Sequence, residues 1–365
     1  MKYGIRDVKI SAALKKNKSS FSGFPTRSSA RKFIQKKTAR NLSLKSLYKE
    51  IQADLEKVED NLGLFAQSPN KLISEIGSYL FQKPGKRMRP ALLTLCSKLL
   101  GYRGNEHILM STLVEAIHTA SLIHDDIIDK SEVRRGCKSV HARWGPNITV
   151  LLGDYLYIKS IGLSLQSPHR QIIQILTDIS ARMIEGELNE YYLSGHLDLT
   201  ENDYLDIINK KTASLFSASC QIGGILGGAI EEEQSALRDF GTNIGMSFQI
   251  IDDLLDFTGD EYTLGKPVLS DISEGRITLP LIYTLHNDGD ANRKRLAELL
   301  TEKPLRKKAR DEILDIVTSN GALDYTFKKA KDFSLKSREI ISQFPESSHR
   351  ETLALFSDFI LTREK

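Results

Sequence analysis

Two groups of aspartates in this chain share one spacing and could together bind divalent cations. The first Asp box is Asp125, Asp126 and Asp129, and the second Asp box, 127 residues later, is Asp252, Asp253 and Asp256. On a helix, the first and last carboxylates of each box lie one turn apart on one face. Carboxylates so close together repel one another unless a cation neutralises them. A ligand set of oxygens, without the spacing of a His or Cys site, favours Mg²⁺ over Zn²⁺.

The apolar neighbours of the two boxes favour a cleft over an exposed surface. Isoleucine or leucine flanks the acids in both boxes, as at Ile127, Ile128, Leu254 and Leu255. One such box alone is often a solvated acidic face, but its recurrence in one helical chain is hard to explain in that way. Facing each other, the boxes would line a pocket for Mg²⁺ ions bridged by a diphosphate, because Mg²⁺ often shares its ligand shell with substrate phosphates.

Several basic residues near the boxes could bind phosphate. Three cations fall in the run Gly85–Pro90, which follows a Pro-Gly turn and leads into a predicted helix. Helix N-termini favour anions, and arginine offers two parallel donors to phosphate oxygens. Arg134 and Arg135 follow the first Asp box in the adjoining loop. The remaining candidates are Lys210, Lys211, Lys266 and His118, although each alone is more often an exposed lysine or a buried structural histidine.

Helices must position these residues, and helical periodicity fills the chain from about Ser43 onward. Apolar residues recur at spacings of three and four, and turn signals such as Gly145-Pro146-Asn147 separate the segments. The predicted helices cover residues 44–62, 72–81, 91–100, 108–128, 148–165, 172–193, 204–224, 232–257, 279–286 and 291–300, and helical patterns continue to the C-terminus. Alternating β-type runs are scarce. We therefore predict an all-α fold, a single-domain helical bundle.

Composition is typical of a globular protein. The chain has 365 residues, which is long enough for a large core, and 40% of them are hydrophobic and 27% charged. No apolar run approaches the roughly 18 residues that span a bilayer. The cysteines, Cys96, Cys137 and Cys220, are widely spaced and form no metal-ligand pattern. We interpret them as reduced, packed thiols.

The basic charge of the chain is confined to its N-terminus. Within residues 1–40, eight Lys and four Arg oppose only Asp7, so this part carries +11 although the whole chain carries +4. The other 325 residues therefore carry −7, which argues against nucleic-acid binding. We predict a basic, disordered extension over residues 1–42 and one helical domain over residues 43–365. A membrane-surface patch or a transit peptide is the alternative for the extension.

In their order along the chain, the motifs resemble the trans-isoprenyl diphosphate synthase family, also called polyprenyl synthetases. The resemblance extends over residues 45–362, and its carriers are Gly85–Pro90, Glu115–Asp129, Arg134–Gly136, Gly153–Asp154, Lys211–Ala213, Phe248–Asp256 and Leu264–Pro267. It implies an all-helical fold around a deep central cavity, usually in a homodimer. It also implies a prenyltransferase that joins isopentenyl diphosphate in trans to an allylic diphosphate by ionisation, condensation and elimination.

The resemblance also implies roles for residues that match the family motifs. The six aspartates of the two boxes would hold Mg²⁺, as three ions, on the allylic diphosphate, which Arg134, Lys211 and Lys266 would contact. Lys86, Arg89, His118 and Arg135 would bind isopentenyl diphosphate, and Thr212 and Gln249 would lie near the developing cation. The implied catalytic set is Asp125, Asp126, Asp129, Lys211, Thr212, Gln249 and Asp252. This chain has Arg276 where many members have Lys, which keeps the charge.

The side chains one helical turn before the first Asp box limit product length in this family. Here they are Ala120 and Ser121, both small. The resemblance therefore implies a long product of about C30–C50, suited to quinone side chains, with a geranylgeranyl or farnesyl diphosphate synthase as the alternative. Release of such a product would involve peripheral membrane contact. We expect a cytoplasmic protein, or an organellar one if the N-terminal extension is a transit peptide.

Other classes of protein fit the sequence less well. A class I terpene cyclase would lack an intact second Asp box and the run Gly85–Pro90, and a noncatalytic regulatory subunit would have lost box residues. A metal-storing bundle would repeat Glu-x-x-His pairs, which occur here once, at Glu115 and His118. A catalytic subunit that requires a small partner stays open, and the activity of the purified chain would decide it.

Overall fold

The computed structural model describes residues 42–82, 85–259, 268–287, 289–302 and 305–363. Residues 1–41 of the predicted extension and the candidate ligand Lys266 lie outside the described residues. The helices are α2 (Leu44–Leu47), α3 (Gln52–Phe65), α4 (Lys71–Phe81), α5 (Met88–Leu99), α6 (Glu106–Ile128), α7 (Val140–Trp144), α8 (Pro146–Ser164), α9 (Arg170–Tyr192), α10 (Glu201–Ile208), the π-helix η1 (Asn209–Ala213), α11 (Ser214–Leu226), α12 (Glu231–Thr258), α14 (Ser270–Ser273), α15 (Leu279–Asn287), α16 (Asp290–Leu300), α17 (Lys307–Ser319), α18 (Ala322–Ser342) and α19 (Ser348–Thr362). The all-α prediction is confirmed.

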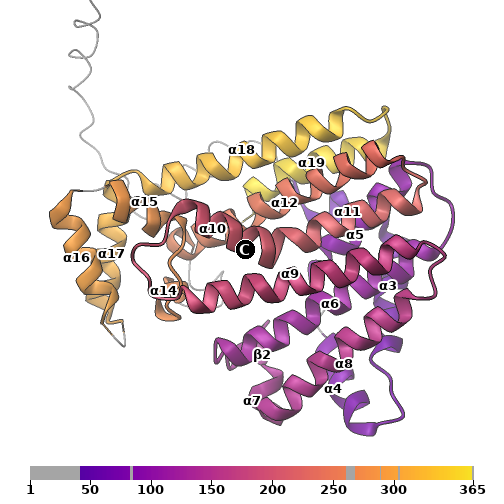
Figure 1. The fold of residues 1–365 in the computed structure, drawn as a ribbon, viewed down its shortest axis with the longest axis horizontal. Coiled ribbons are helices and arrows are strands. Elements are labelled where there is room, and N and C mark those ends of the chain that lie inside the picture. The colour runs from indigo at the N-terminus through magenta and orange to yellow at the C-terminus, as the bar shows by residue number, and fades with distance from the viewer. Residues whose placement is uncertain (1–41, 83–84, 260–267, 288, 303–304, 364–365) are drawn as a thin grey trace, which may run out of the picture.

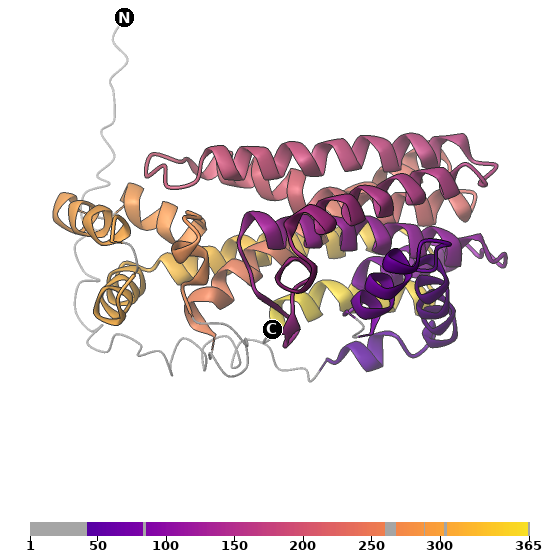
Figure 2. The same cartoon turned by 90° about the horizontal axis from the view of Figure 1, so that it is seen from below.

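The helices pack in layers around two central ones, α6 and α12. Helix α12 packs against α11 and α18, while α6 packs against α8 and α5 (Figures 1 and 2). One hydrophobic cluster surrounds α12 and another surrounds α6, and α5 and α11 contribute buried side chains to both. The two helices that carry the Asp boxes are therefore joined through shared core helices. None of the described helices is both long and apolar enough to cross a bilayer.

Both Asp boxes lie at the C-terminal ends of their helices. Asp125 and Asp126 fall in the last turn of α6, which Asp129 caps, and the second Asp box falls in the last two turns of α12. The end of a helix dipole is negative there, so carboxylates at these positions are disfavoured unless cations lie nearby. The fold therefore concentrates negative charge at one place, which favours binding of a cation.

A short hairpin follows the first Asp box where the sequence suggested only a loop. Strands β1 (Val133–Arg134) and β2 (Cys137–Lys138) pair antiparallel. The two residues between them, Arg135 and Gly136, have φ values of 52° and 72°. Two left-handed residues in succession are typical of a tight type I′ turn. The hairpin thereby holds two candidate phosphate ligands, Arg134 and Arg135, in fixed places.

The predicted helix over residues 204–224 is divided by the π-helix η1, which contains Lys211 and Thr212. Short π-helical turns are frequent at functional sites. Helices α9 and α12 approach η1 closely because Gly186 and Gly245 have no side chains. A Cβ at Gly186 would lie 2.6 Å from the backbone N of Lys211, and one at Gly245 would lie 2.4 Å from Cα of Ala213. This close packing fixes the backbone that carries Lys211.

Candidate active site

Two cavities meet where the Asp boxes face each other. The first cavity, of about 360 Å³, lies between the ends of α6 and α12 and reaches α9, α10 and residues 271–278. The second cavity, of about 430 Å³, is lined by α6, α8, α9 and α12. The residues that line both are Asp125, Arg134, Lys211, Thr212, Gln249 and Asp252. A charged junction is thus continuous with a second cavity that has apolar walls, including Leu122, Met183 and Leu188.

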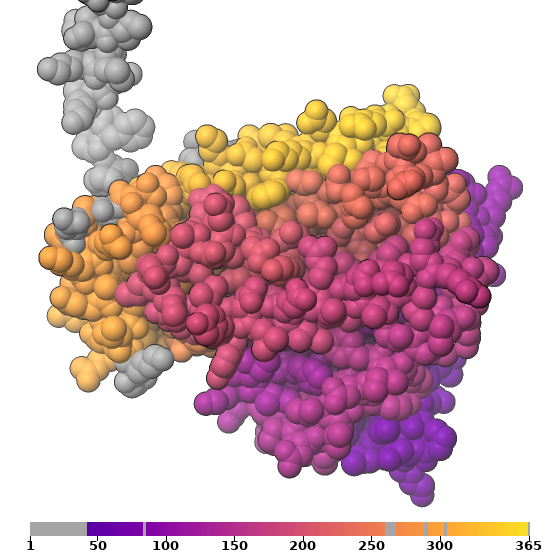
Figure 3. Space-filling view, in the orientation of Figure 1, coloured from indigo at the N-terminus to yellow at the C-terminus, as the bar shows by residue number. Residues whose placement is uncertain are grey.

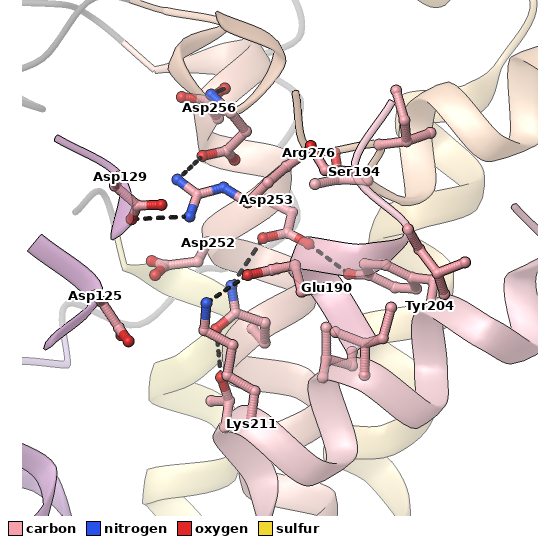
Figure 4. A pocket seen from close by; sticks show the side chains of 18 of the residues that line it. Asp125, Asp129, Glu190, Ser194, Tyr204, Lys211, Asp252, Asp253, Asp256 and Arg276 are labelled. Atoms are coloured by element: carbon pink, nitrogen blue, oxygen red, sulfur yellow. Dashed lines mark hydrogen bonds and ion pairs between the residues drawn. The ribbon is translucent and has the colours of Figure 1, made fainter. Parts of the chain in front are cut away.

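Five of the six box aspartates line the first cavity, and Asp126 does not. Figure 4 shows Asp125 and Asp129 on one side of this cavity and the aspartates of the second Asp box on the other. Asp126 is almost fully buried, and it accepts hydrogen bonds from Arg134 Nε at 2.7 and 2.8 Å. Arg134 Nη2 also lies 2.7 Å from Asp126 Oδ1. Asp126 therefore fixes Arg134 from behind the cavity wall.

Asp125 is buried at the junction of the two cavities, among charges of both signs. Burial raises the pKa of Asp125 to about 7, Lys211 opposes that rise, and Glu187 and Asp129 add to it. Lys211 Nζ lies 2.5 Å from Glu187 and also forms an ion pair with Glu190, both on α9. Burial alone would lower the pKa of Lys211, but its three carboxylate neighbours raise it above the usual value. The single lysine is thus shared among acids that together exceed its charge.

The second Asp box is held by a chain of hydrogen bonds. Thr212 Oγ1 donates to Gln249 Oε1 at 2.9 Å, and Gln249 Nε2 donates to Asp253 Oδ1 at 2.8 Å. The hydroxyl of Tyr204 donates to Asp253 Oδ2 at 2.6 Å (Figure 4). Burial, followed by the charge of Asp271, raises the pKa of Asp253 to about 8, although the bonds from Tyr204 and Gln249 oppose the rise. The charged form of Asp253 is therefore disfavoured unless a cation lies nearby.

Asp256 and Arg276 fix the segment that follows α12. Asp256 is buried and accepts hydrogen bonds from the hydroxyl of Ser270 at 2.8 Å and from the backbone N–H groups at the start of α14. The guanidinium of Arg276 lies 3.2 Å from Asp129 and 3.3 Å from Asp271, and it also pairs with Glu274. Arg276 thus links the first Asp box to the segment beyond the second (Figure 4).

The donor set fits Mg²⁺ that is shared with a substrate. Among the described residues, no group of three or more His, Cys, Asp or Glu side chains is placed to hold a metal ion by itself. Asp125, Asp129 and Asp252 instead line one space from two helices, which leaves room for phosphate oxygens and water to complete a shell of oxygens. The raised pKa values of Asp125 and Asp253 indicate carboxylates that a cation would stabilise in the charged form.

A second group of cations surrounds the start of α5. Arg89 is 8% exposed, stacks over the ring of Phe216 at 4.2 Å and lines the second cavity. Its Nε is buried without a hydrogen-bond partner among the described residues. Lys86 is exposed, with Nζ 6.0 Å from the ring centroid of Phe248. The Arg135 guanidinium lies against Gly85, where a Cβ would be 2.6 Å from Nη2. Of these three cations, Arg89 lines the second cavity, and Lys86 lies beside Phe248 on the wall of that cavity.

His118 lies with this group and is uncharged at neutral pH. It lines the second cavity, and burial, aided by Arg89 and Arg135, lowers its pKa well below the usual value. A neutral imidazole donates from one ring nitrogen only. Of the four residues expected at the second diphosphate site, Arg89 and His118 line the second cavity, Lys86 lies beside Phe248 on its wall, and Arg135 lies near enough to act on the His118 pKa.

The two residues expected to limit product length lie in different surroundings. Ser121 lines the second cavity, but Ala120 is fully buried in the core and lines neither cavity. The reason is helical geometry: at 100° per residue, position 121 lies about 40° from the face of Asp125, and position 120 lies about 140° away. On α8, Tyr157 lines the cavity near Ser121, which sequence reasoning did not identify.

Sequence reasoning also missed four other residues of the site. Glu187 and Glu190 lie on α9, where no sequence motif marks them. Tyr204 lies 49 residues before Asp253, the residue that it contacts. Arg363, near the C-terminus, donates to Asp252 at 2.7 Å and stacks over Phe248 at 3.7 Å. No spacing in the sequence marks these four residues, because their contacts join segments that only the fold brings together.

Comparison with known protein sequences finds one family. The family model described as Polyprenyl synthetase matches residues 70–317. The octaprenyl diphosphate synthase of Haemophilus influenzae is 35% identical over 312 residues, which are 86% of this chain and 94% of that protein. The geranylgeranyl diphosphate synthase of Sulfolobus acidocaldarius is 34% identical over 85% of this chain and 97% of that protein.

Comparison with solved structures agrees. The crystal structure of a polyprenyl synthase from Caulobacter crescentus CB15, complexed with calcium and isoprenyl diphosphate, superposes with a TM-score of 0.85 at 32% identity, over 89% of this chain and 99% of that one. The decaprenyl diphosphate synthase of Rhodobacter capsulatus gives a TM-score of 0.84 at 32% identity, over 88% of this chain and all of that one. The similarity extends over both helices that carry an Asp box.

Proposed function

Because the chain belongs to the polyprenyl synthetase family, we propose that it is a prenyltransferase that makes a long-chain polyprenyl diphosphate. It adds isopentenyl diphosphate units in trans to an allylic diphosphate. The observation that carries this function is the pair of Asp boxes across one cavity that continues into a second, partly apolar one. Octaprenyl and decaprenyl diphosphate synthases among the relatives support a long product, and geranylgeranyl diphosphate synthases are the shorter alternative.

We propose that Asp125, Asp129, Asp252 and Asp253, which all line the first cavity, are ligands of Mg²⁺, while Asp256 holds α14. Family membership implies Mg²⁺-dependent catalysis, while the number of three ions stays a prediction. When bound, the metal neutralises the charge that develops on the departing diphosphate. Asp126 acts indirectly, because it directs Arg134 toward the cavity.

Arg134 and Lys211 would hold the allylic diphosphate from the side opposite the second Asp box. Both line the first cavity, and the acids around Lys211 keep it charged. Lys266 stays a prediction for the same diphosphate. On the far side of the junction, Lys86, Arg89, His118 and Arg135 would bind isopentenyl diphosphate. The buried Nε of Arg89, which has no hydrogen-bond partner in the described part of the chain, supports an anion there.

The allylic cation must be kept from water while it condenses. Thr212 and Gln249 lie at the junction of the cavities, so their oxygen atoms are near the developing charge. The apolar walls of the second cavity exclude water from it. The protein needs no base of its own, since the departing diphosphate can accept the proton. The tail would then grow past Ser121 and Tyr157.

We also propose that two copies of the chain associate through α8 and α9, which lie on the face seen in Figure 3. The apolar side chains there that are more than half exposed are Leu151, Ile158, Leu165, Ile184, Leu188, Tyr191 and Tyr192. Apolar patches of this kind mark protein interfaces. Light scattering should give a dimer for the purified chain and a monomer for Ile158→Glu. Membrane contact and a cytoplasmic location stay predictions.

The test of the function is direct. The purified chain is incubated with farnesyl diphosphate, isopentenyl diphosphate and Mg²⁺, and the products are sized by chromatography. We expect products beyond C20, of about C30–C50. A product that stops at C15 or C20 would contradict the long-chain proposal. Activity that appears only after a small partner is added would indicate a heteromeric synthase.

A further inference from the structure

The three cations of the run Gly85–Pro90 lie in different surroundings. Lys86 is exposed beside Phe248, and Arg89 lines the second cavity. Neither Lys86 nor Arg87 lines the first or the second cavity, and Arg87 lines a smaller third cavity, of about 60 Å³, with Arg134 and Arg135. Arg87 is 6% exposed, and its guanidinium faces carboxylates of the protein. Charge alone therefore does not assign Arg87 to the phosphate site.

The ion pairs of Arg87 connect three elements. Its Nη2 donates to Glu59 Oε2 on α3 at 2.9 Å, and its Nε donates to the other oxygen of Glu59. Its Nη1 donates to Glu115 on α6 at 2.5 Å, and Glu115 is only 3% exposed. The paired fork of Arg87 on Glu59 fixes direction as well as distance. The start of α5 is thereby attached to both α3 and α6.

The backbone at Arg87 also needs this support. Arg87 is the N-cap of α5 and has φ 52°, in the left-handed region that residues with a side chain seldom adopt. Such a conformation persists where neighbouring contacts fix it. The hydroxyl of Tyr48 provides one more contact, since it donates to the carbonyl of Lys86 at 2.6 Å. These contacts all act on the residues between Lys86 and Arg89.

We propose that Arg87 is a positioning residue: its ion pairs with Glu59 and Glu115 hold the turn in the one conformation that presents Lys86 and Arg89 to the second diphosphate. This inference rests on the proposed function, because it assumes that isopentenyl diphosphate binds there. Glu115 has a second role in this arrangement. It lies one turn before His118 and opposes the lowering of the pKa that burial imposes on Arg89 and Arg135.

The alternative role for Arg87 is that of a phosphate ligand. A change at Glu59 distinguishes this role from the positioning role. Glu59 lies on α3 and lines neither cavity. If Arg87 binds phosphate itself, Glu59→Gln releases it, and affinity for isopentenyl diphosphate stays the same or rises. If Arg87 positions the turn, the same change loosens it, and affinity falls. Glu59 is about one-third exposed, so this variant should fold even if Arg87→Met does not.

The experiment measures KM for each substrate, kcat and the melting temperature of the full chain. Wild type must first elongate an allylic diphosphate; if it does not, the proposed function fails and the variants are not interpreted. Arg87→Met should raise KM for isopentenyl diphosphate by about tenfold or more, because small misplacements of binding groups have large effects. Glu59→Gln should raise it several-fold. In both variants KM for farnesyl diphosphate should change less than about twofold, and Arg87→Lys should fall between wild type and Arg87→Met.

Arg103→Met, at an exposed arginine in the turn before α6, is the matched control and should leave both KM values unchanged. Three results would overturn the proposal. An unchanged KM for isopentenyl diphosphate in Arg87→Met removes any role in binding. A normal or lower KM for isopentenyl diphosphate in Glu59→Gln would show that Arg87 is a phosphate ligand. Equal increases of both KM values with a lower melting temperature leave only a general structural role.

Discussion

The hydrogen bond from Tyr204 to Asp253 should set how much Mg²⁺ the enzyme needs. The bond is 2.6 Å long, and both side chains are buried. A hydrogen bond to a charged group contributes about 1.5–3 kcal/mol. Since one pKa unit corresponds to about 1.4 kcal/mol, removing this bond should raise the pKa of Asp253 by about one to two units. Asp253 already has a pKa raised to about 8, so Tyr204→Phe makes its charged form rarer at neutral pH.

The sign of the effect follows from competition between proton and metal. Mg²⁺ binds the carboxylate, so its apparent affinity falls as the ligand becomes protonated. Below the pKa, each unit of increase lowers the charged fraction about tenfold. At pH 7.5 we therefore expect Tyr204→Phe to need at least about tenfold more Mg²⁺ for half-maximal activity. The difference from wild type should shrink as the pH rises toward the raised pKa.

The assay is a Mg²⁺ titration of initial rate at several pH values with saturating substrates. Tyr325→Phe is the matched control, because the Tyr325 hydroxyl also donates to a carboxylate, that of Glu201, at 2.6 Å but away from both cavities. The control should keep the wild-type Mg²⁺ requirement. The reasoning is refuted if Tyr204→Phe loses rate without any change in that requirement, or if the change is the same at every pH.

Substitutions at four further residues test the remaining geometry. Ser121→Phe should shorten the product to about C20, whereas Ala120→Phe should overpack the core and lower stability by about 1–3 kcal/mol, as sizing of products and thermal melting would show. Arg276→Met should raise KM for the allylic diphosphate about tenfold while Arg276→Lys keeps most of the affinity, because charge rather than fork geometry bridges the cleft. Lys211→Met should raise the pKa of Asp125 above about 7, so the acid limb of kcat/KM should move to higher pH.

The helices and the Asp boxes could be predicted because their signals are local. Spacings of three and four placed α6 and α12 to within about two residues, and one turn of helix put Asp125 and Asp129 on one face. The register within a turn was harder: Ala120 and Ser121 differ by 100°, and only packing decides which one faces the cavity. The π-helix was also hidden, since it depends on the close approach of Gly186 and Gly245.

Contacts between distant segments could not be predicted from one sequence. Arg363 lies 111 residues after Asp252, and Arg276 lies 147 residues after Asp129. The number of residues between the partners does not predict either ion pair, because ion pairs across a bundle depend on how whole helices pack. Arg87 shows the converse. In the sequence it stands among cations that we propose to bind phosphate, yet its guanidinium faces Glu59 and Glu115.

The ion pairs of the cleft explain how a protein with an acidic body binds two diphosphates. Arg276 pairs with Asp129, Arg363 pairs with Asp252, and Lys211 pairs with Glu187 and Glu190. Charges left without a partner in such a cleft are costly, so substrate and metal should replace these pairs together. A bound metal would pair with the carboxylates, and a bound diphosphate would pair with the cations that they release. Diphosphate alone would leave the aspartates without a cation, and metal alone would leave the arginines without an anion. Each should therefore bind more tightly in the presence of the other.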